Sequence, residues 1–131
     1  MILLASAALA VVLAAAAWLV FVGLVCAVRP DLALAQLGRM GGSWAIQIGE
    51  HALRAAAGAA LILRADYSKA PEIFAIGGWF VLLSSLAILI LPRAWHHAYS
   101  RYWAQKIPPV AVRIMAIPTF AAAGWLAYAA F

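Results

Sequence analysis

The uncharged run from Met1 to Val28 is the feature that most limits how this chain can fold, and it ends at Arg29 and Pro30. A helix needs about 20 mostly apolar residues to cross a membrane. A cleaved signal peptide has an apolar stretch of only about 7–15 residues and starts with basic residues, which are missing here. We therefore expect a retained membrane-spanning helix.

The composition of the whole chain agrees with a membrane protein. Its 131 residues are 69% hydrophobic and 10% charged, whereas a soluble domain is about 45–50% apolar and about 25% charged. This excludes a soluble enzyme, a disordered tail and a nucleic-acid-binding domain with a basic face in water. The single cysteine, Cys26, excludes a disulfide framework and a cysteine-rich zinc site.

We predict an all-α integral membrane protein with four spans in two tandem helical hairpins, at about residues 2–28, 41–63, 73–91 and 110–131. The second span is the least apolar, because its first half contains Gln47, Glu50, His51 and Arg54. Pro118 lies inside the fourth span, where membrane helices tolerate proline.

The basic residues predict the orientation. The first connection contains Arg29 and Arg39, and the third contains Arg93, Arg101 and Lys106. Short loops rich in Lys and Arg face the cytoplasm, so both termini are predicted on the outer, periplasmic side. The formal net charge of +5 then reflects topology and attraction to anionic lipid head groups, at about 1 kcal/mol per basic residue. No nucleic-acid partner is expected.

The two halves share a plan, which suggests a tandem repeat over residues 1–65 and 73–131. Each half has an apolar helix, a connection that begins with proline and arginine, and a second apolar helix with an arginine near its start, Arg54 or Arg113. Two such units would be related by an axis along the membrane normal.

A family resemblance rests on residues of the second half: Pro92, Arg93, Ala94, Trp95, Pro108, Arg113 and Gly124. In this order they resemble the YjeT-like family of short, two-helix bacterial inner-membrane proteins of unknown function. The resemblance implies a helical architecture and a bacterial inner membrane, and it implies no activity. The first half departs from the pattern, because no tryptophan follows Arg29 and Pro30.

The polar residues of the second span form the most informative cluster. Gln47, Glu50, His51 and Arg54 share one side of a helix, and Glu50 and Arg54 have the spacing of an ion pair. Ionisable groups within a span are costly and suggest function. In one interpretation the pair only anchors the helix. In the other, the cluster lines a water-filled path or relays protons.

Ligand sites are less well supported by the sequence. His51 could be an axial ligand to a haem or a pigment, but no other predicted span contains a histidine. His96 and His97 point about 100° apart on a helix and have no carboxylate nearby in the sequence, so we expect neither a metal nor a cofactor.

The connection between the third and fourth spans predicts an interfacial amphipathic helix. Trp95, Tyr99, Tyr102 and Trp103 recur at helical spacing, while Arg93 and Arg101 lie on other faces, and Lys106 follows near its end. Such a helix lies at the head-group boundary, or its aromatic side docks on a partner protein. Arg113 is expected as a basic residue at the entrance of the last span.

No catalytic motif is present. The function expected from the sequence is therefore a small non-catalytic inner-membrane protein that packs as an accessory, assembly or stabilising subunit against a larger membrane complex. Its expected partners are lipids and other membrane subunits, or a second copy of itself. Two alternatives stay open, namely a small homo-oligomeric transporter or channel that uses Glu50, His51 and Arg54, and a haem- or pigment-binding subunit that uses His51.

Overall fold

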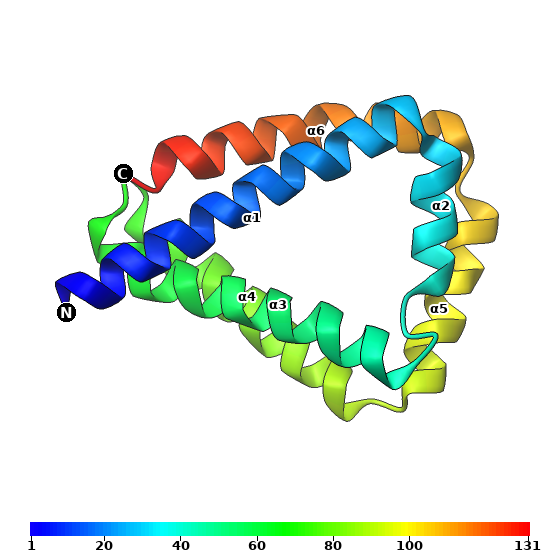
Figure 1. Ribbon diagram of the computed structural model, residues 1–131, viewed down its shortest axis with the longest axis horizontal. Coiled ribbons are helices and arrows are strands. Elements are labelled where there is room, and N and C mark those ends of the chain that lie inside the picture. The colour runs from blue at the N-terminus through cyan, green and yellow to red at the C-terminus, as the bar shows by residue number, and fades with distance from the viewer.

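A computed structural model describes all 131 residues and contains helices joined by short connections, with no strand. The prediction of an all-α chain is confirmed. Figure 1 shows the elements, which are α1 (Ile2–Val28), α2 (Pro30–Arg39), α3 (Trp44–Arg64), the 3-10 turn η1 (Ala65–Tyr67), α4 (Pro71–Ile90), α5 (Arg93–Lys106) and α6 (Pro109–Ala129).

Three of the helices, α1, α4 and α6, are long and apolar enough to cross a membrane. They coincide with three of the four predicted spans, which is consistent with a membrane protein. The helix at the second predicted span, α3, has 21 residues. This corresponds to about 31 Å at 1.5 Å per residue, close to the thickness of a hydrocarbon core. Its length suffices, but Glu50, Arg54 and the other polar groups of its first half make it less apolar than the other three.

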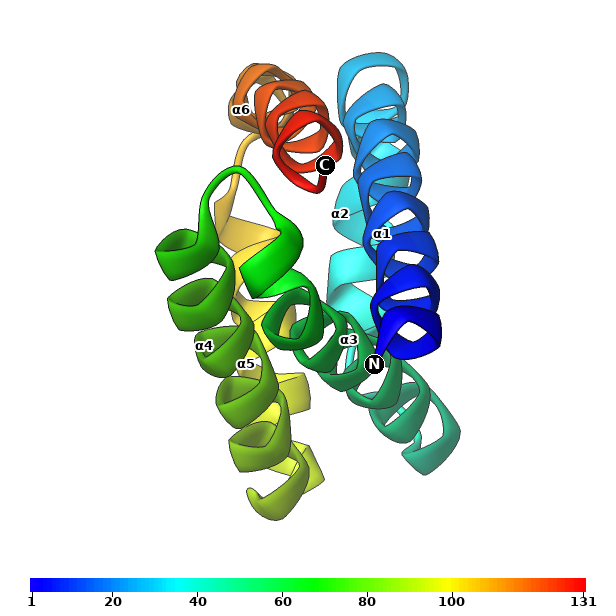
Figure 2. The same ribbon diagram turned by 90° about the vertical axis from the view of Figure 1, so that its left-hand side faces the viewer.

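The most extensive packing joins α3 with α4 and α1 with α6, and α1 also packs on α3, as α2 does on α5. Figures 1 and 2 show two layers, α1/α6 and α3/α4, which converge at the end that holds both termini and separate toward α2 and α5. The layout of two hairpins predicted from the sequence is not confirmed: α1 packs on α3, but α4 and α6 make little contact, and each packs mainly on a helix of the other half. The short segment 65–70 folds α4 directly back on α3. In contrast, α2 lies between α1 and α3 and is roughly 15 Å long, and α5 lies between α4 and α6 and is roughly 21 Å long.

The converging end is held by hydrogen bonds to the last carbonyl groups of α6. Arg64 Nε donates to the Ala130 carbonyl at 2.8 Å, and Lys69 Nζ donates to the Tyr128 carbonyl at 3.0 Å. The Lys69 backbone N–H adds a bond to the Ala129 carbonyl at 2.9 Å. These carbonyls have no partner within the helix, and positive charge is favourable at this end of the helix dipole. The buried core lies at the same end and consists of Ala8, Val12, Ala60, Ala65, Phe74, Ala129 and Ala130.

The α3 and α4 backbones touch at Gly58 and Gly78. A Cβ atom on Gly58 would lie 2.9 Å from the Gly78 carbonyl oxygen, and one on Gly78 would lie 2.8 Å from the Gly58 carbonyl oxygen. Small residues allow such close approach between membrane helices. At Gly77, by contrast, an added Cβ atom would have no neighbour within 4 Å, so only one of two adjacent glycines is required by packing.

We therefore predict opposite effects for Gly78→Ala and Gly77→Ala. The first forces α3 and α4 apart and destabilises the protein by about 1–3 kcal/mol, the range for overpacking. The second meets open space and gains helix propensity, so its stability stays equal or rises slightly. Thermal unfolding followed by circular dichroism in detergent measures both, and equal midpoints for the two variants would contradict the packing described.

Candidate functional site

The polar side chains of α3 and α5 meet at the wide end of the molecule, beside the loop that joins α2 to α3. Gly41 in this loop has a φ of 68°, which glycine adopts without strain. A Cβ there would lie 3.0 Å from His96 Nδ1, so the loop runs tightly against α5. Helix α3 starts after Ser43, whose hydroxyl oxygen accepts a hydrogen bond from the Ile46 N–H at 3.2 Å and caps the helix.

Gln47 is completely buried and connects three helices. Its Nε2 donates to the Ile88 carbonyl on α4 at 3.1 Å, and its Oε1 lies 2.7 Å from Nδ1 of His96 on α5. Because an amide oxygen can only accept, this geometry places the proton of a neutral His96 on Nδ1.

His51 lies next to Gln47 and His96 but takes no part in their hydrogen bonds. Its side chain is 4% exposed, and neither ring nitrogen has a hydrogen-bond partner in the protein. The ring meets that of His96 edge to face, with centroids 5.0 Å apart. Glu50 Oε2 is also buried without a partner. One donor atom each from Glu50, His51 and His96 lies within 4.8 Å of the others.

The ion pair expected between Glu50 and Arg54 does not form. Arg54 Nη2 instead donates to the Ser84 hydroxyl on α4 at 3.1 Å, because it faces the neighbouring helix while Glu50 faces the junction with α5. The single salt bridge of the protein joins Arg29 and Asp31 at the start of α2, at 3.2 Å. There the hydrogen-bonded Arg29 guanidinium holds the pKa of the Asp31 carboxyl below its ordinary value.

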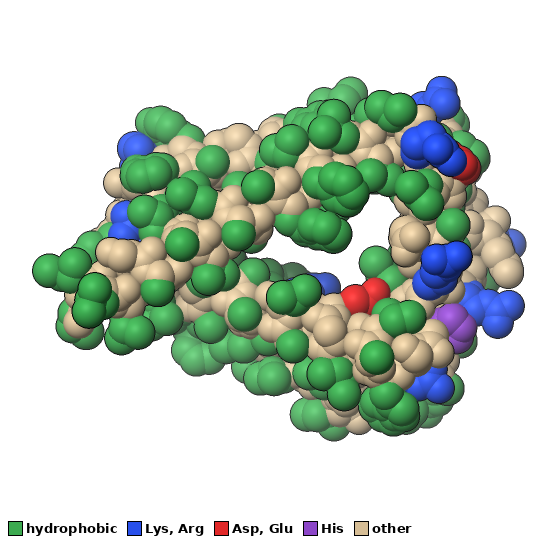
Figure 3. All heavy atoms as spheres, in the orientation of Figure 1, with side chains coloured by type: hydrophobic (Ala, Val, Ile, Leu, Met, Phe, Trp, Pro, Cys, Tyr) green, Lys and Arg blue, Asp and Glu red, His purple; other side chains and the backbone are tan.

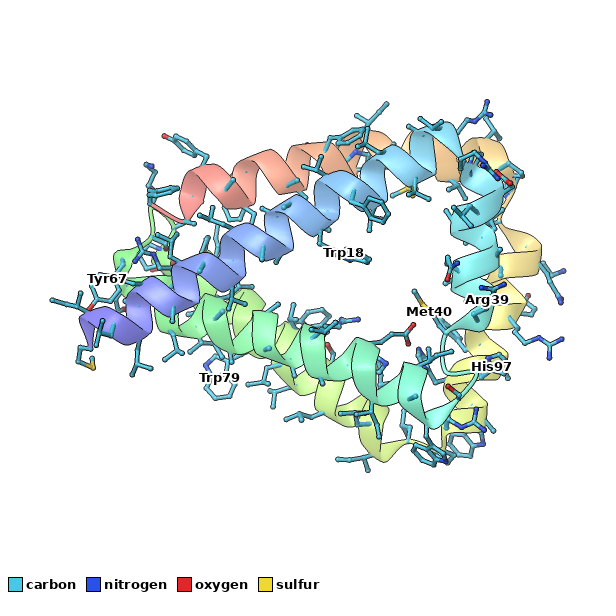
Figure 4. The ribbon with its side chains drawn as sticks, viewed as in Figure 1. Trp18, Arg39, Met40, Tyr67, Trp79 and His97 are labelled. Carbon is cyan, nitrogen blue, oxygen red and sulfur yellow. The ribbon has the colours of Figure 1, made fainter.

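Two residues of α5 hold the same loop from the other side. Arg93 Nη1 donates to the Gly41 carbonyl at 2.7 Å, and His97 Nδ1 lies 2.8 Å from the Met40 carbonyl oxygen. Met40 and His97 are labelled in Figure 4. His96 and His97 therefore contact different partners, as expected for adjacent residues of a helix.

The remaining predicted site residues lie outside this cluster. The aromatic side chains of α5 are exposed, and Lys106 Nζ lies 5.6 Å above the ring of Tyr102. Arg113 is exposed near the start of α6. The predicted site residues of α5 that are exposed are Trp95, Tyr99, Arg101, Tyr102, Trp103 and Lys106.

An opening passes between the two helix layers in the space-filling view (Figure 3). Hydrophobic side chains border it along α1, and acidic atoms lie at its edge over α3, whose only acidic residue is Glu50. Trp18 points into it from α1 (Figure 4). The Trp18 side chain is 63% exposed, and its ring lies 5.3 Å from that of Phe21. Basic atoms lie beside these acidic atoms, so the opening combines an apolar border along α1 with a charged edge (Figure 3).

His96 is a residue that the sequence analysis considered as a metal ligand and rejected, because no carboxylate lies near it in the sequence. The positive-inside pattern placed both connections on one side of the membrane, and this was a signal that the loop near residue 41 and the helix after residue 92 could meet. His96 reaches His51 because α3 packs on α4, which leads directly into α5, and because α2 packs on α5.

We predict that Gln47→Leu lowers stability more than His97→Leu does. The first leaves the His96 Nδ1–H and the Ile88 carbonyl without their partner in a buried place, and we expect a loss of about 1–2 kcal/mol. The second removes one bond to a loop carbonyl at a half-buried position. Thermal unfolding of the detergent-solubilised variants measures both losses, and an unchanged midpoint for Gln47→Leu would show that the amide does not join the helices.

Comparisons with known proteins give no match. No family model, no curated protein and no solved structure is matched by this chain. The resemblance to the YjeT-like family therefore stays a prediction, and function is argued from the residues and their geometry.

Proposed function

We propose that this chain is a non-catalytic, multi-pass protein of the bacterial inner membrane that acts as an accessory, assembly or stabilising subunit of a larger membrane complex. The observation that carries the proposal is the opening between the two helix layers, which hydrophobic side chains border along α1 and into which Trp18 points. Membrane helix bundles associate through close packing of small side chains. Here α1 and α3 pack together only near the end that holds the termini and diverge toward α2, which leaves Trp18 and Phe21 largely exposed.

A transmembrane helix of another subunit is the occupant that we propose for this opening. Trp18 and Phe21 are 63% and 53% exposed, and aromatic side chains of this kind supply much of the energy of protein interfaces. A helix from a partner has an apolar surface and leaves no backbone group unsatisfied, as the membrane interior demands. The exposed aromatic side of α5 offers a second contact at the head-group boundary.

We infer four membrane crossings, with α3 as the fourth. Both termini lie at the same end of the molecule in Figure 1, and α3 packs along α4 and returns the chain to that end. Lys and Arg side chains gather over α2 and α5 in Figure 3, which supports a cytoplasmic location for this end. The polar half of α3 then lies near the cytoplasmic head groups, where charged groups cost less than at the membrane centre.

This topology predicts the labelling of two introduced cysteines. In a Cys26→Ala background, Asp66→Cys in η1 should react with a membrane-impermeant maleimide from the periplasm, because α3 has carried the chain across. Gln36→Cys in α2 is the control and should react only from the cytoplasm. Labelling of Asp66→Cys from the cytoplasm would mean that α3 does not cross.

We also infer that the two halves are a tandem repeat. Exchanging α1, α2 and α3 for α4, α5 and α6 keeps three of the observed pairs, because α1 with α6 becomes α4 with α3, and α2 stays with α5. This is the pairing that a two-fold axis along the membrane normal would produce. The packing of α1 on α3 has no counterpart of similar extent between α4 and α6.

Photo-crosslinking tests the proposed subunit role. A photoactivatable phenylalanine derivative in place of Trp18 should form an adduct with a membrane polypeptide other than this chain, in cells of the source organism. The matched control is the same derivative in place of Trp79, which is 51% exposed on α4 and lies away from the opening in Figure 4. At this control position we expect lipid adducts only.

The other outcomes of this experiment separate the alternatives. Adducts at position 18 with a second copy of this chain would favour a homo-oligomeric transporter or channel, which the carboxylate at the edge of the opening also favours. Lipid adducts alone would contradict the subunit proposal. A haem or pigment bound by His51 is disfavoured by geometry, because the ring is 4% exposed and lies against His96.

A further inference from the structure

We propose that Glu50, His51 and His96 form a binding site for one divalent transition-metal ion of the zinc type. Two of these residues come from α3 and the third from α5, and one donor atom of each lies within 4.8 Å of the others. This inference does not depend on the accessory role, since it concerns only side chains of this chain.

The distances suit an ion after small side-chain movements. Zinc takes nitrogen and oxygen ligands at about 2.0–2.2 Å in a tetrahedral arrangement, so two of its ligands lie about 3.4 Å apart. Contraction from the observed spacing needs side-chain rotations that move each donor by about 1 Å. Glu50 and His96 are only half-buried and can make this movement.

The second argument is the buried imidazole of His51. Buried polar atoms nearly always have a hydrogen-bond partner, yet both nitrogens of this ring and Oε2 of Glu50 have none. A bound cation satisfies a nitrogen of His51 and the Glu50 oxygen together. The rings of His51 and His96 meet edge to face and do not stack. Stacked rings would direct their nitrogens away from a common metal position.

The third argument is the partner of His96. Metal-binding histidines usually donate their other ring N–H to an oxygen, which fixes the tautomer and the orientation of the ring. Gln47 Oε1 provides this acceptor at 2.7 Å from Nδ1, and the Gln47 amide is itself held by the Ile88 carbonyl. The lone pair of His96 is thereby left on Nε2, through which this residue would bind the ion.

The donor set indicates the class of ion. Two imidazoles and one carboxylate suit zinc and its first-row neighbours, whereas calcium and magnesium prefer oxygen ligands alone. A soft ion such as Cu(I) prefers thiolate or thioether sulfur, and the one cysteine, Cys26, is not part of the group. Three protein ligands leave a fourth position for water or a donor from a partner. The ion would join α3 to α5 at the wide end of the molecule.

Zinc titration of the full chain in lipid nanodiscs tests the site, with a purification tag that contains no histidine and with metal first removed by a chelator. We expect wild type to bind about one zinc ion per chain. His51→Ala and His96→Ala should each lower the affinity more than tenfold, and Glu50→Gln, which keeps the side-chain shape, should lower it as well. The matched control is His97→Ala, which removes the neighbouring histidine and should leave zinc affinity unchanged.

Two further measurements keep the outcome decisive. Circular dichroism verifies that each variant is helical, and if His51→Ala does not fold, Glu50→Gln and His96→Ala decide the test. Cobalt in place of zinc should give visible absorption bands in wild type and in His97→Ala, and not in the ligand variants. Absence of saturable zinc binding by wild type, or an equal loss in His97→Ala and His96→Ala, would overturn the proposal.

Discussion

The wide end of this molecule depends on one buried amide. Gln47 has no exposed surface, and it can be buried only because its two ends find partners on two other helices, Ile88 on α4 and His96 on α5. An unsatisfied amide in an apolar environment is strongly unfavourable. The positions of α3, α4 and α5 relative to one another are therefore coupled through a single side chain, and the neighbouring Glu50 and His51 take their places from this arrangement.

The long apolar helices could be predicted from the sequence with small errors at their ends. The span predicted at residues 73–91 is the helix Pro71–Ile90, and that predicted at 110–131 is Pro109–Ala129. Proline at the start of each helix and continuous hydrophobicity within it are local signals, so they need no knowledge of the fold. The helix after Pro92 could likewise be predicted from the spacing of its aromatic residues, and the structure has a helix there from Arg93 to Lys106.

The pairing of helices and the composition of the site could not be predicted in this way. Spacing along α3 suggested an ion pair between Glu50 and Arg54, but a neighbouring helix provided Ser84 as an acceptor for the arginine. His96 is far from His51 in the sequence and reaches it through the packing of α3 on α4 and of α2 on α5. Which helices pack together depends on contacts such as that between Gly58 and Gly78. The adjacent Gly77 makes no such contact, so the presence of a glycine does not by itself identify a packing position.

The lengths of α2 and α5 determine how far apart the two helix layers lie at the wide end of the molecule. The two layers are fastened at one end by Arg64 and Lys69, while the other end is set apart by helices of 10 and 14 residues. An insertion of one helical turn in such a spacer adds about 5.4 Å to its length. A longer or shorter α2 and α5 would therefore change the separation of the two layers at this end, with no change in the sequence of the long helices.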